Sequence, residues 1–556
     1  MRALRPARGG VDLRAIAAIA AVVGVLGAIL VLPIGAVFFG AIRSDSAYGA
    51  KVLATLIAPA TRRVVAFTVS QAVVSAGISV VLAVPVAYAV SHYHFPGRRL
   101  FYSLSIVPFV LPSIVVVICV ISFYGRAGLI NRLFGTDWNL VYNPVGIVIA
   151  HVFFNFSLAV RILADGWSRI DSRLYDSART LGSRSRGVFA RVAFPLVLPS
   201  IGTAFLLIFI YCFFSFGVVL VFGGIRYTTL EVETYSRMFV RLDVSTASVY
   251  ALLQLIVSLC AVVVMNRVVF RTERHGRSVV RRRRPLSASN ARWFLIVYGV
   301  LVLVFLGGPI VTMTARAFGS PDGFSTRNFR VLFQPGPRDW ETESVAGAPV
   351  ARIITTSLSL AGVSGTVTFA LALMTAFVLK RRRTAVLEAL VTAPMCVSIV
   401  TVAIGMRLVF AGIVPDIVLV VLAQTVLGFP FVFRIADTTL SALPDSYADA
   451  ARSLGASRIA AVRDVVIPLV SRGLLNAYAY AVAIALADFT AVFTLGRGNI
   501  VTFPVAIYRL IGFRGFDRAL ALGVIYIGIC SVVFFWVDRT SGRDIDRGKG
   551  NLVDHA

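Results

Sequence analysis

Two polar segments of the chain carry the same residue types at the same spacing. They are residues 176–195, DSARTLGSRSRGVFARVAFP, and residues 449–468, DAARSLGASRIAAVRDVVIP, and the second begins 273 positions after the first (449 − 176). Each starts with an acidic residue and two small residues, and each has a glycine six positions after the acid. Small side chains let another surface approach closely, and glycine reaches backbone angles that other residues avoid. These residue types predict a docking element for a soluble partner.

Eight residues are expected to form this docking element. They are Asp176, Ser177, Ala178 and Gly182 in the first copy and Asp449, Ala450, Ala451 and Gly455 in the second. In each copy we expect a short helix, a break at the glycine, and a second amphipathic helix that stops as the next apolar span begins. Pro195 and Pro468 suit the first turn of that span, because an amide donor is not missed there.

Long apolar spans surround both segments. The chain is 58% hydrophobic and only 14% charged, which excludes a soluble globule. Its apolar runs are long enough to cross a hydrocarbon core. We expect twelve spans, at about 14–41, 64–90, 101–124, 144–163, 196–222, 247–270, 293–315, 353–379, 385–411, 414–433, 474–496 and 518–537. The first is too long for a cleaved signal peptide, and no cleavage site with a soluble domain follows it.

Further matches show that the duplication extends beyond the two polar segments. AHVFFNFSLAVRI at 150–162 matches AQTVLGFPFVFRI at 423–435 at the same shift of 273, whereas residues 113–115 match residues 398–400 at a shift of 285 (398 − 113). About 12 extra residues (285 − 273) therefore lie in the first half, near 126–142, as expected of a loop. We predict a first half at 1–270, a basic linker at 271–292 and a second half at 293–556. Six spans in each half make the halves parallel.

The basic residues predict the orientation in the membrane. Most of the 54 Lys and Arg residues lie on the side that holds both termini and the even-numbered loops, including the run at 281–284. Loops rich in Lys and Arg are cytoplasmic, so both termini are expected inside. The net charge of +28 is split among loops between spans, which favours contact with anionic lipid over nucleic acid.

The duplicated loops resemble a loop of a known transporter family. They fit the pattern acid-Ser/Ala-Ala-x3-Gly-x9-Val-x2-Pro, which is similar to the EAA loop, Glu-Ala-Ala-x3-Gly-x9-Ile-x-Leu-Pro, of ABC importer permeases. The chain departs from that loop with Asp for Glu in both copies, Ser177 for Ala, and Phe194 and Ile467 for Leu. The resemblance implies an all-α integral membrane fold of twelve transmembrane helices, as two parallel six-helix repeats of the type I importer permease. It also implies coupling loops at about 164–195 and 436–468.

The same resemblance implies the partners. In this family the loop forms a coupling helix that docks on an ATP-hydrolysing subunit, and this chain has no G-x4-G-K-[S/T] loop with which to bind ATP itself. We therefore expect a transport subunit and not an enzyme, without cofactor or metal, that binds two copies of a cytoplasmic ABC ATPase subunit. A periplasmic or lipid-anchored substrate-binding protein and a place in a bacterial inner membrane are also implied.

The cargo is suggested by a narrower resemblance. Segments such as 122–135 and 147–163 look most like the fused permeases of the thiamine and ferric-iron importer group. This implies import of thiamine or a related small cation, with ferric iron as the alternative. Four residues are candidates for the translocation path, because an acid and aromatic rings suit a cation: Asp488, Ser215, Phe216 and Phe489. An acid paired with a neighbouring helix, and aromatic rings in plain core packing, are the alternatives.

Several other features have more than one interpretation. Glu231 and Glu233 are expected on an outward loop, in contact with a binding protein or with solvent. Prolines at positions 108, 112 and 394 are expected to break the third and ninth helices.

Two rival classes of protein are weighed against the importer. A secondary transporter of the major facilitator type also has parallel six-span halves, but residues 91–100, SHYHFPGRRL, lack the acid and spacing usual in that group. A membrane-embedded enzyme is disfavoured, because the sequence offers no cluster of His, Cys and carboxylate residues at a useful spacing.

Overall fold

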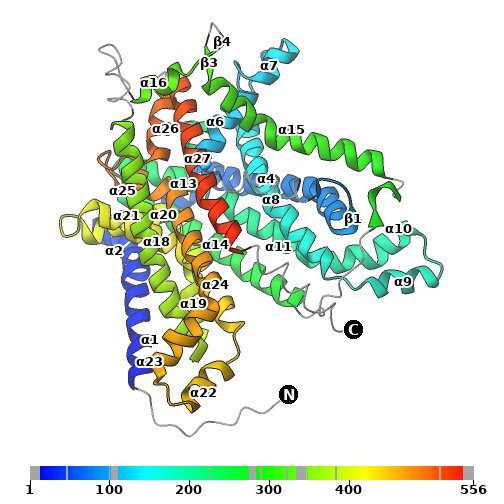
Figure 1. The fold of residues 1–556 in the computed structure, drawn as a ribbon. Coiled ribbons are helices and arrows are strands. Elements are labelled where there is room, and N and C mark those ends of the chain that lie inside the picture. Colours follow the sequence, from blue (N-terminus) through cyan, green and yellow to red (C-terminus); the bar gives the residue numbers. More distant parts are fainter. Residues whose placement is uncertain are drawn as a thin grey trace. The chain divides into compact units, whose positions relative to one another are not determined.

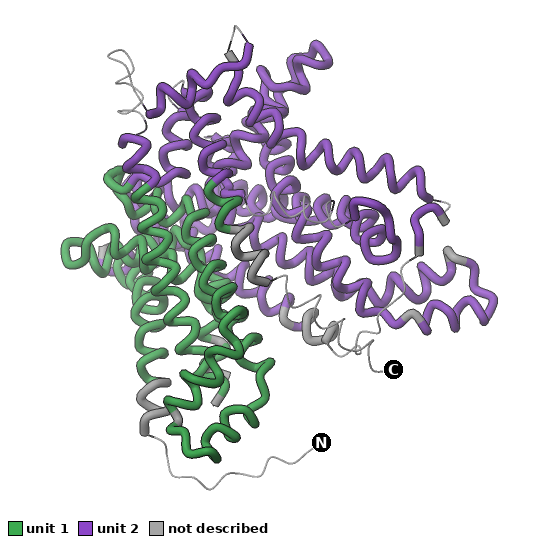
Figure 2. Tube along the Cα trace, in the orientation of Figure 1, with its two compact units in different colours: residues 1–40, 355–500, 529–556 green, residues 41–354, 501–528 purple. Residues whose placement is uncertain are grey.

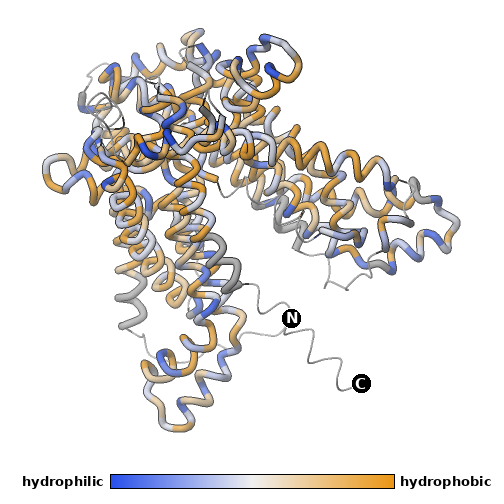
Figure 3. The backbone as a smooth tube through the Cα atoms, turned by 45° about the horizontal axis from the view of Figure 1, so that its top comes forward, coloured by the Kyte–Doolittle hydropathy of each residue, from blue (hydrophilic) through white to orange (hydrophobic). Residues whose placement is uncertain are grey.

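The computed structural model shows a chain made mostly of helices (Figure 1). It describes residues 13–44, 48–98, 101, 111–224, 226–273, 284–288, 291–320, 323–333, 346, 348–381, 385–512 and 515–541. Within these ranges, eleven helices are long and apolar enough to cross a membrane. The number is twelve if Leu390–Cys396 and Ile399–Phe410, which are bent by 108° relative to each other, form one span. The predicted all-α membrane fold is thus confirmed, and Figure 3 shows hydrophobic residues along these helices.

Two compact units make up the chain, and Figure 2 colours them separately. Unit 1 contains residues 1–40, 355–500 and 529–556, and unit 2 contains residues 41–354 and 501–528. The division at 270 and 293 follows the sequence repeat and stays a prediction. The units differ from it because the first span of each predicted half packs among helices of the other.

Unit 1 combines the N-terminal span with helices of the second half. Glycine at position 405 is required by this packing, because a Cβ there would lie 2.0 Å from the carbonyl oxygen of Pro33. Ser398 caps the helix that contains Gly405 by accepting a hydrogen bond from the amide of Thr401. The helices are α1 (Leu13–Leu26), η1 (Gly27–Val31), α2 (Leu32–Ser44), α18 (Val350–Arg381), α19 (Ala385–Thr392), η5 (Ala393–Cys396), α20 (Ile399–Phe410), α21 (Asp416–Ser441), α22 (Ser446–Ser453), α23 (Arg458–Ala461), η6 (Val462–Val466), α24 (Ile467–Ala487) and α25 (Thr490–Leu495).

Unit 2 holds most of the first half. Asn143 starts one of its spans by accepting hydrogen bonds from Val145 and Gly146, and Pro144 occupies the first helical turn. Its helices are α3 (Tyr48–Ile57), α4 (Pro59–His92), α6 (Ser113–Tyr124), α7 (Leu129–Phe134), α8 (Pro144–Ser168), α9 (Ser172–Thr180), α10 (Ser185–Val188), η2 (Phe189–Ala193), α11 (Phe194–Phe213), α12 (Gly217–Phe222), α13 (Leu230–Tyr235), η3 (Ser236–Val240), α14 (Val244–Glu273), η4 (Leu286–Ala288), α15 (Arg292–Ala317), α16 (Arg327–Phe333), α26 (Phe503–Gly512) and the start of α27 (Phe516–Ser541).

The span α15 packs on α4 and α6 within unit 2. The hydroxyl of Tyr298 donates to the carbonyl of Leu82 at 2.6 Å, and the thiol of Cys119 lies 3.5 Å from the sulfur of Met313. Four two-residue strands complete the described structure. They form a parallel pair, β1 (Tyr93–His94) with β2 (Arg284–Pro285), and an antiparallel pair, β3 (Gly319–Ser320) with β4 (Gly323–Phe324).

Two of the predicted spans differ from the structure. The helix predicted at 196–222 ends at Phe213, and α12 begins at Gly217. The helix predicted at 474–496 ends at Ala487, and α25 begins at Thr490. Apolar composition continues across both breaks, so hydropathy alone does not reveal them.

The structure describes two of the three prolines that were predicted to break helices. Pro394 lies in η5, at the 108° bend, and Pro112 immediately precedes α6. Pro108 and residues 274–283 of the basic linker lie outside the described residues.

Candidate functional site: the duplicated loops and the interrupted spans

Each duplicated loop folds into a short helix that ends beside the predicted glycine. Gly182 follows α9 with a φ of 80°, and Gly455 follows α22 with a φ of 92°. In the first loop the amide of Gly182 donates to the carbonyl of Arg179 at 2.9 Å, and the next amide donates to Ala178 at 3.0 Å. The corresponding distances in the second loop are 3.0 and 3.1 Å. This pair of bonds is a Schellman motif, which requires a positive φ at its turn.

The two glycines are therefore needed for backbone conformation and not for tight packing. A Cβ added to either glycine would meet no atom within 4 Å. The open space around both positions leaves this turn accessible to another molecule.

A leucine with a largely solvent-exposed side chain precedes each glycine. Leu181 is 85% exposed and Leu454 is 89% exposed, and they are repeat equivalents (454 − 181 = 273). The same exposed apolar side chain therefore recurs at the same place in both loops. These leucines fall on unspecified positions of the loop pattern, and the only sequence signal for them is the recurrence of Leu directly before the glycine.

The predicted acids lie on the same surface. Asp176 is paired with Arg179 at 3.9 Å, and Asp449 with Arg452 at 3.3 Å, so each acid has an exposed partner three residues later in its own helix. Ser177 and its equivalent Ala450 are exposed, whereas Ala178 and Ala451 are half-buried. All eight predicted docking residues thus lie in these two helical turns.

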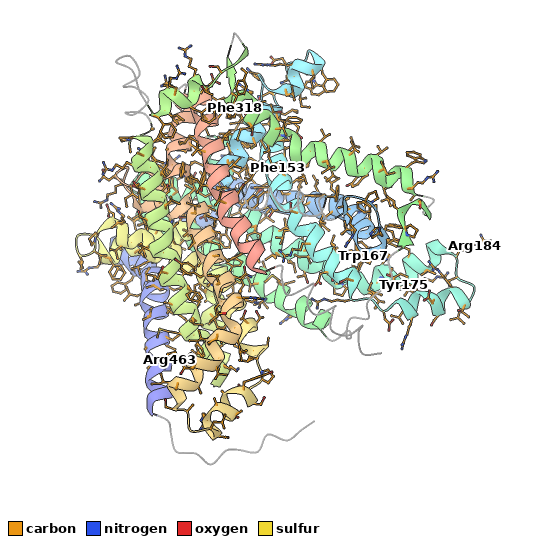
Figure 4. All side chains as sticks on the ribbon, in the orientation of Figure 1. Phe153, Trp167, Tyr175, Arg184, Phe318 and Arg463 are labelled. Carbon is orange, nitrogen blue, oxygen red and sulfur yellow. The ribbon has the colours of Figure 1, made fainter. Side chains whose placement is uncertain are left out.

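An aromatic cluster attaches the first loop to its spans. Trp167, at the end of α8, contacts Tyr88 with ring centroids 5.7 Å apart, and both rings neighbour His92. His92 also contacts Tyr175 of α9 at 6.1 Å, and Tyr88 contacts Phe189 of η2 at 6.2 Å. Figure 4 labels Trp167 and Tyr175 where α8 meets α9, with Arg184 on the turn beyond α9. Movement of α9 must therefore act on α4 and α8.

A lysine attaches the second loop instead. Lys380, at the end of α18, donates to the carbonyls of Leu440 at 3.0 Å and Leu443 at 3.2 Å, and it pairs with Asp445 at 3.0 Å. These three acceptors lie between the end of α21 and the start of α22. The loop is thus tied to α18 by charge-assisted hydrogen bonds.

The second helix of each loop does not stop before the next span, so that part of the prediction was wrong. α10 continues through the π-helical turn η2 into α11, and α23 continues through the π-helical turn η6 into α24. Pro195 and Pro468 each lie two residues after the last residue of these turns. A proline inside a continuous helix lacks an amide donor and crowds the preceding turn, and a π-helical turn relieves both problems.

The interrupted spans contain the residues predicted for the translocation path. Asp488 lies in the break between α24 and α25, not inside a span, and is 7% exposed. Its equivalent Ser215 is half-buried in the break after α11. Phe216 and Phe489 are each 2% exposed; Phe216 packs on Tyr235. Both alternatives weighed for these residues therefore have structural support: core packing for the rings and pairing with a neighbouring helix for the acid.

The partner of Asp488 is an amide on the neighbouring helix α21. Gln424 Nε2 donates to Asp488 Oδ2 at 3.2 Å, and the backbone amide of Ala491 donates to Asp488 Oδ1 at 3.3 Å. Ser364 of α18 donates in turn to Gln424 Oε1 at 2.7 Å. All three side chains are buried, so they form a polar chain across three helices of unit 1.

The predicted exposure of two outward carboxylates was wrong. Glu231 and Glu233 are 1% and 7% exposed, because α13 packs against α4 and α14 instead of projecting into solvent. Glu231 accepts a hydrogen bond from Gln254 at 2.5 Å, and Glu233 accepts one from Arg237 at 2.8 Å. Arg237 lies four residues after Glu233, at the usual spacing of a helical ion pair, whereas Gln254 lies 23 residues after Glu231 on another helix and has no such local signal.

Asp243 lies next to this group and ties α3 to the start of α14. Its carboxylate accepts hydrogen bonds from Lys51 at 3.0 Å and from the amide of Thr246 at 3.2 Å. Desolvation alone would raise the pKa of Asp243, but the hydrogen bonds from Thr246 and Lys51 outweigh it, and the pKa lies below its ordinary value.

Comparison with known proteins identifies the family to which the chain belongs. The profile of the family described as "binding-protein-dependent transport system inner membrane component" matches residues 79–274 and 368–545. The thiamine transport system permease protein of Escherichia coli (strain K12) is 27% identical over 500 residues, which is 87% of this chain and 89% of that protein. Its counterpart in Brucella abortus (strain 2308) is 27% identical over 86% of this chain and 88% of that protein.

A shorter relative matches over less of the chain. The probable sulfate transport system permease protein of Nephroselmis olivacea is 28% identical over 242 residues, or 43% of this chain and 84% of that protein. One copy of the family domain thus falls in each repeat, on helices that include both glycine-ended loops and both interrupted spans. The chain belongs to the family of inner-membrane components of binding-protein-dependent transport systems, as a fused permease with two copies of the domain.

Proposed function

We propose that this chain is the membrane-spanning subunit of an ATP-driven importer for thiamine. The support is that thiamine permeases are similar to it over 86–87% of its length, whereas the sulfate permease relative matches 43%. ATP is bound and hydrolysed by a separate subunit, and a binding protein delivers the cargo. Both termini lie in the cytoplasm of a bacterial cell.

The observation that carries the proposal is the short helix that occurs in both duplicated loops. In each loop it ends at a glycine that is preceded by an exposed leucine. Leu181 and Leu454 supply an apolar contact, and Asp176 and Asp449 supply a charge beside it. Gly182 and Gly455 keep the contact surface free of a side chain. One ATPase subunit docks on each loop, so two copies bind one permease chain.

Force passes from the loops to the spans through the contacts described above. In unit 2 the aromatic cluster connects α9 to α4 and α8, and in unit 1 Lys380 connects the start of α22 to α18. Closure of the ATPase pair on ATP moves both loops, and the spans change from an inward-open to an outward-open arrangement. Asp488, Ser215, Phe216 and Phe489 lie along the path that this change opens.

Cysteine cross-linking tests the docking. In a variant without the native cysteines, Leu181→Cys and Leu454→Cys are each expected to form a disulfide or short cross-link with the co-expressed ATPase subunit. Leu242→Cys is the matched control, because Leu242 is 79% exposed but lies on the loop between η3 and α14. If only Leu242→Cys captured the ATPase subunit, the subunit would not dock on the duplicated loops, and the proposal would be rejected.

Uptake of labelled thiamine tests the cargo. A bacterial strain without its own thiamine importer is expected to accumulate thiamine when this permease, its ATPase and its binding protein are expressed together. Uptake should stop when the ATPase carries a substitution in its phosphate-binding lysine. Accumulation of ferric iron and not thiamine by the same strain would assign the alternative cargo.

A further inference from the structure

The polar chain around Asp488 has a counterpart in the first half that lacks the acid. Ser75 Oγ lies 3.3 Å from His151 Nδ1, and both side chains are buried. His151 is the repeat equivalent of Gln424 (424 − 151 = 273), and Ser75 and Ser364 each lie 17 residues before the end of their helices, α4 and α18 (92 − 75 and 381 − 364). The link from serine to residue 151 or 424 is therefore duplicated, and the acid at position 488 is not.

Comparison of the two halves distinguishes polar contacts that both halves share from the carboxylate that only one half has. A feature that both halves share serves the common fold, whereas a buried carboxylate present in one half serves the task of that half. Burying a carboxylate costs free energy, so its retention in an apolar bundle calls for a functional reason. Its donors, which include the side-chain amide of Gln424 and the backbone amide of Ala491, are uncharged. Neither of these contacts brings a positive charge to the carboxylate.

We propose that Asp488 binds the cationic ring of an organic cargo, and that Gln424, held by Ser364, is a positioning residue that fixes the carboxylate. This inference rests on the proposed import function and adds the chemical class of the group that is recognised. Thiamine has two rings of different charge. Its thiazolium ring carries a permanent positive charge, and its aminopyrimidine ring is neutral. The proposal assigns the thiazolium ring to Asp488.

The surroundings of Asp488 suit a diffuse organic charge. Each carboxylate oxygen already accepts a hydrogen bond, at 3.2 and 3.3 Å, so the group acts through its charge more than as a chelating pair of oxygens. Phe489 follows Asp488 directly and stacks with Phe493 at 4.9 Å. Aromatic rings beside a carboxylate favour flat, weakly hydrated cations. Because Asp488 is 7% exposed, the cation reaches it only while the surrounding helices are apart.

Competition binding tests this assignment. Labelled thiamine is bound to the permease–ATPase complex in lipid nanodiscs and displaced either by an N-methylthiazolium alcohol or by the neutral aminopyrimidine alcohol. With the unaltered protein both fragments are expected to compete. Asp488→Asn is expected to weaken thiamine binding by about tenfold and to abolish competition by the thiazolium fragment, while the pyrimidine fragment still competes. Asp416→Asn is the control, because Asp416 is an acid of the same unit that pairs with Arg407 and Arg497.

The role of Gln424 is tested by rescue. Gln424→Leu removes the donor to Asp488 and is expected to reduce the preference for the thiazolium fragment. Gln424→His is expected to restore that preference, since histidine at the equivalent position 151 bonds to a serine in the same way. A structural role alone would lower the amount of folded complex without changing the ratio between the two fragments.

The outcomes separate this inference from the proposed function. If the unaltered complex assembles with the ATPase but neither binds nor imports thiamine, the assigned cargo is wrong. If it imports thiamine but Asp488→Asn keeps the thiazolium preference, or if ferric citrate displaces thiamine only when Asp488 is present, the assignment of Asp488 is overturned. Should Asp488→Asn fail to fold, Asp488→Glu replaces it, with weaker binding and a retained thiazolium preference expected.

Discussion

Lys380 reaches from the last turn of α18 to Asp445, 3.0 Å away at the start of α22. The first half makes a related contact, in which Ser91 Oγ at the end of α4 donates to the carbonyl of Ala164 at 3.3 Å. Both contacts join the second span of a half to the end of its fourth span. The contact of Lys380 is charged and has three acceptors, so it is the stronger of the two.

Lys380→Met should uncouple ATP hydrolysis from uptake. The substitution keeps the length of the apolar stem but removes charge-assisted bonds to two carbonyls, each worth about 1.5–3 kcal/mol. Hydrogen exchange of residues 442–457 is expected to rise, and the amount of cargo imported per ATP to fall. Asp445→Asn is the matched variant: it removes only the exposed ion pair, worth about 0–1 kcal/mol, and should leave coupling nearly intact. Equal behaviour of the two variants would argue against the carbonyl contacts.

The double variant Gly182→Asp, Gly455→Asp is expected to lose uptake while still inserting into the membrane. Asp tolerates a positive φ and meets no atom at either position, so the turn should survive, but it places a charged side chain beside Leu181 and Leu454. The companion variant with Asn at both positions adds the same bulk without charge and should keep most of the uptake. Membrane content and uptake rate are measured together, and normal uptake by the Asp variant would contradict the docking role.

Trp167→Ala should loosen α9 without unfolding the membrane helices. Trp167 is 3% exposed and meets the stacked rings of Tyr88 and His92 edge-on, and loss of a buried aromatic ring costs about 3–5 kcal/mol. Faster hydrogen exchange in residues 172–180 and weaker capture of the ATPase are the expected results. Trp138→Ala is the control, because Trp138 is 52% exposed and its removal should leave both measurements unchanged.

Asp243→Asn should release α3 from α14. The pKa of Asp243 is lowered in the folded protein, so its contribution to stability is present above the ordinary value of 3.8 and is lost only as the pH falls through the lower folded value. The protection of residues 48–57, which is the intrinsic exchange rate divided by the observed rate, is therefore expected to stay constant between about pH 5 and about pH 8 in the unaltered protein. The variant should show low protection at every pH in that range. A strong pH dependence of the protection in the unaltered protein would show that another group controls α3.

Much of the fold follows from the sequence because hydrocarbon thickness fixes the length of an apolar span. The span predicted at 144–163 is found as α8, and that predicted at 293–315 as α15. The breaks after Phe213 and Ala487 were not predictable in this way, since the residues on both sides are equally apolar. Hydropathy measures how apolar a segment is and does not show where its helix breaks or changes direction.

The candidate site was predictable where it depends on local backbone geometry. A glycine that ends a helix in each copy of a loop indicates a positive φ, and the structure has that conformation at Gly182 and Gly455. Contacts between distant segments could not be foreseen. Glu231 is buried because Gln254 of another helix meets it, and Asp488 is held by Gln424, 64 positions earlier (488 − 424).

The π-helical turns at Phe189–Ala193 and Val462–Val466 have a mechanical consequence for the duplicated loops. Such a turn contains one residue more than an α-helical turn, and it can migrate along a helix while only a few hydrogen bonds are exchanged at a time. Moving the extra residue past one end of a segment rotates that segment by about 100° around the helix axis. A shift of the π-helical turn by one residue would therefore change the direction of α10 or α23 relative to the span that follows it.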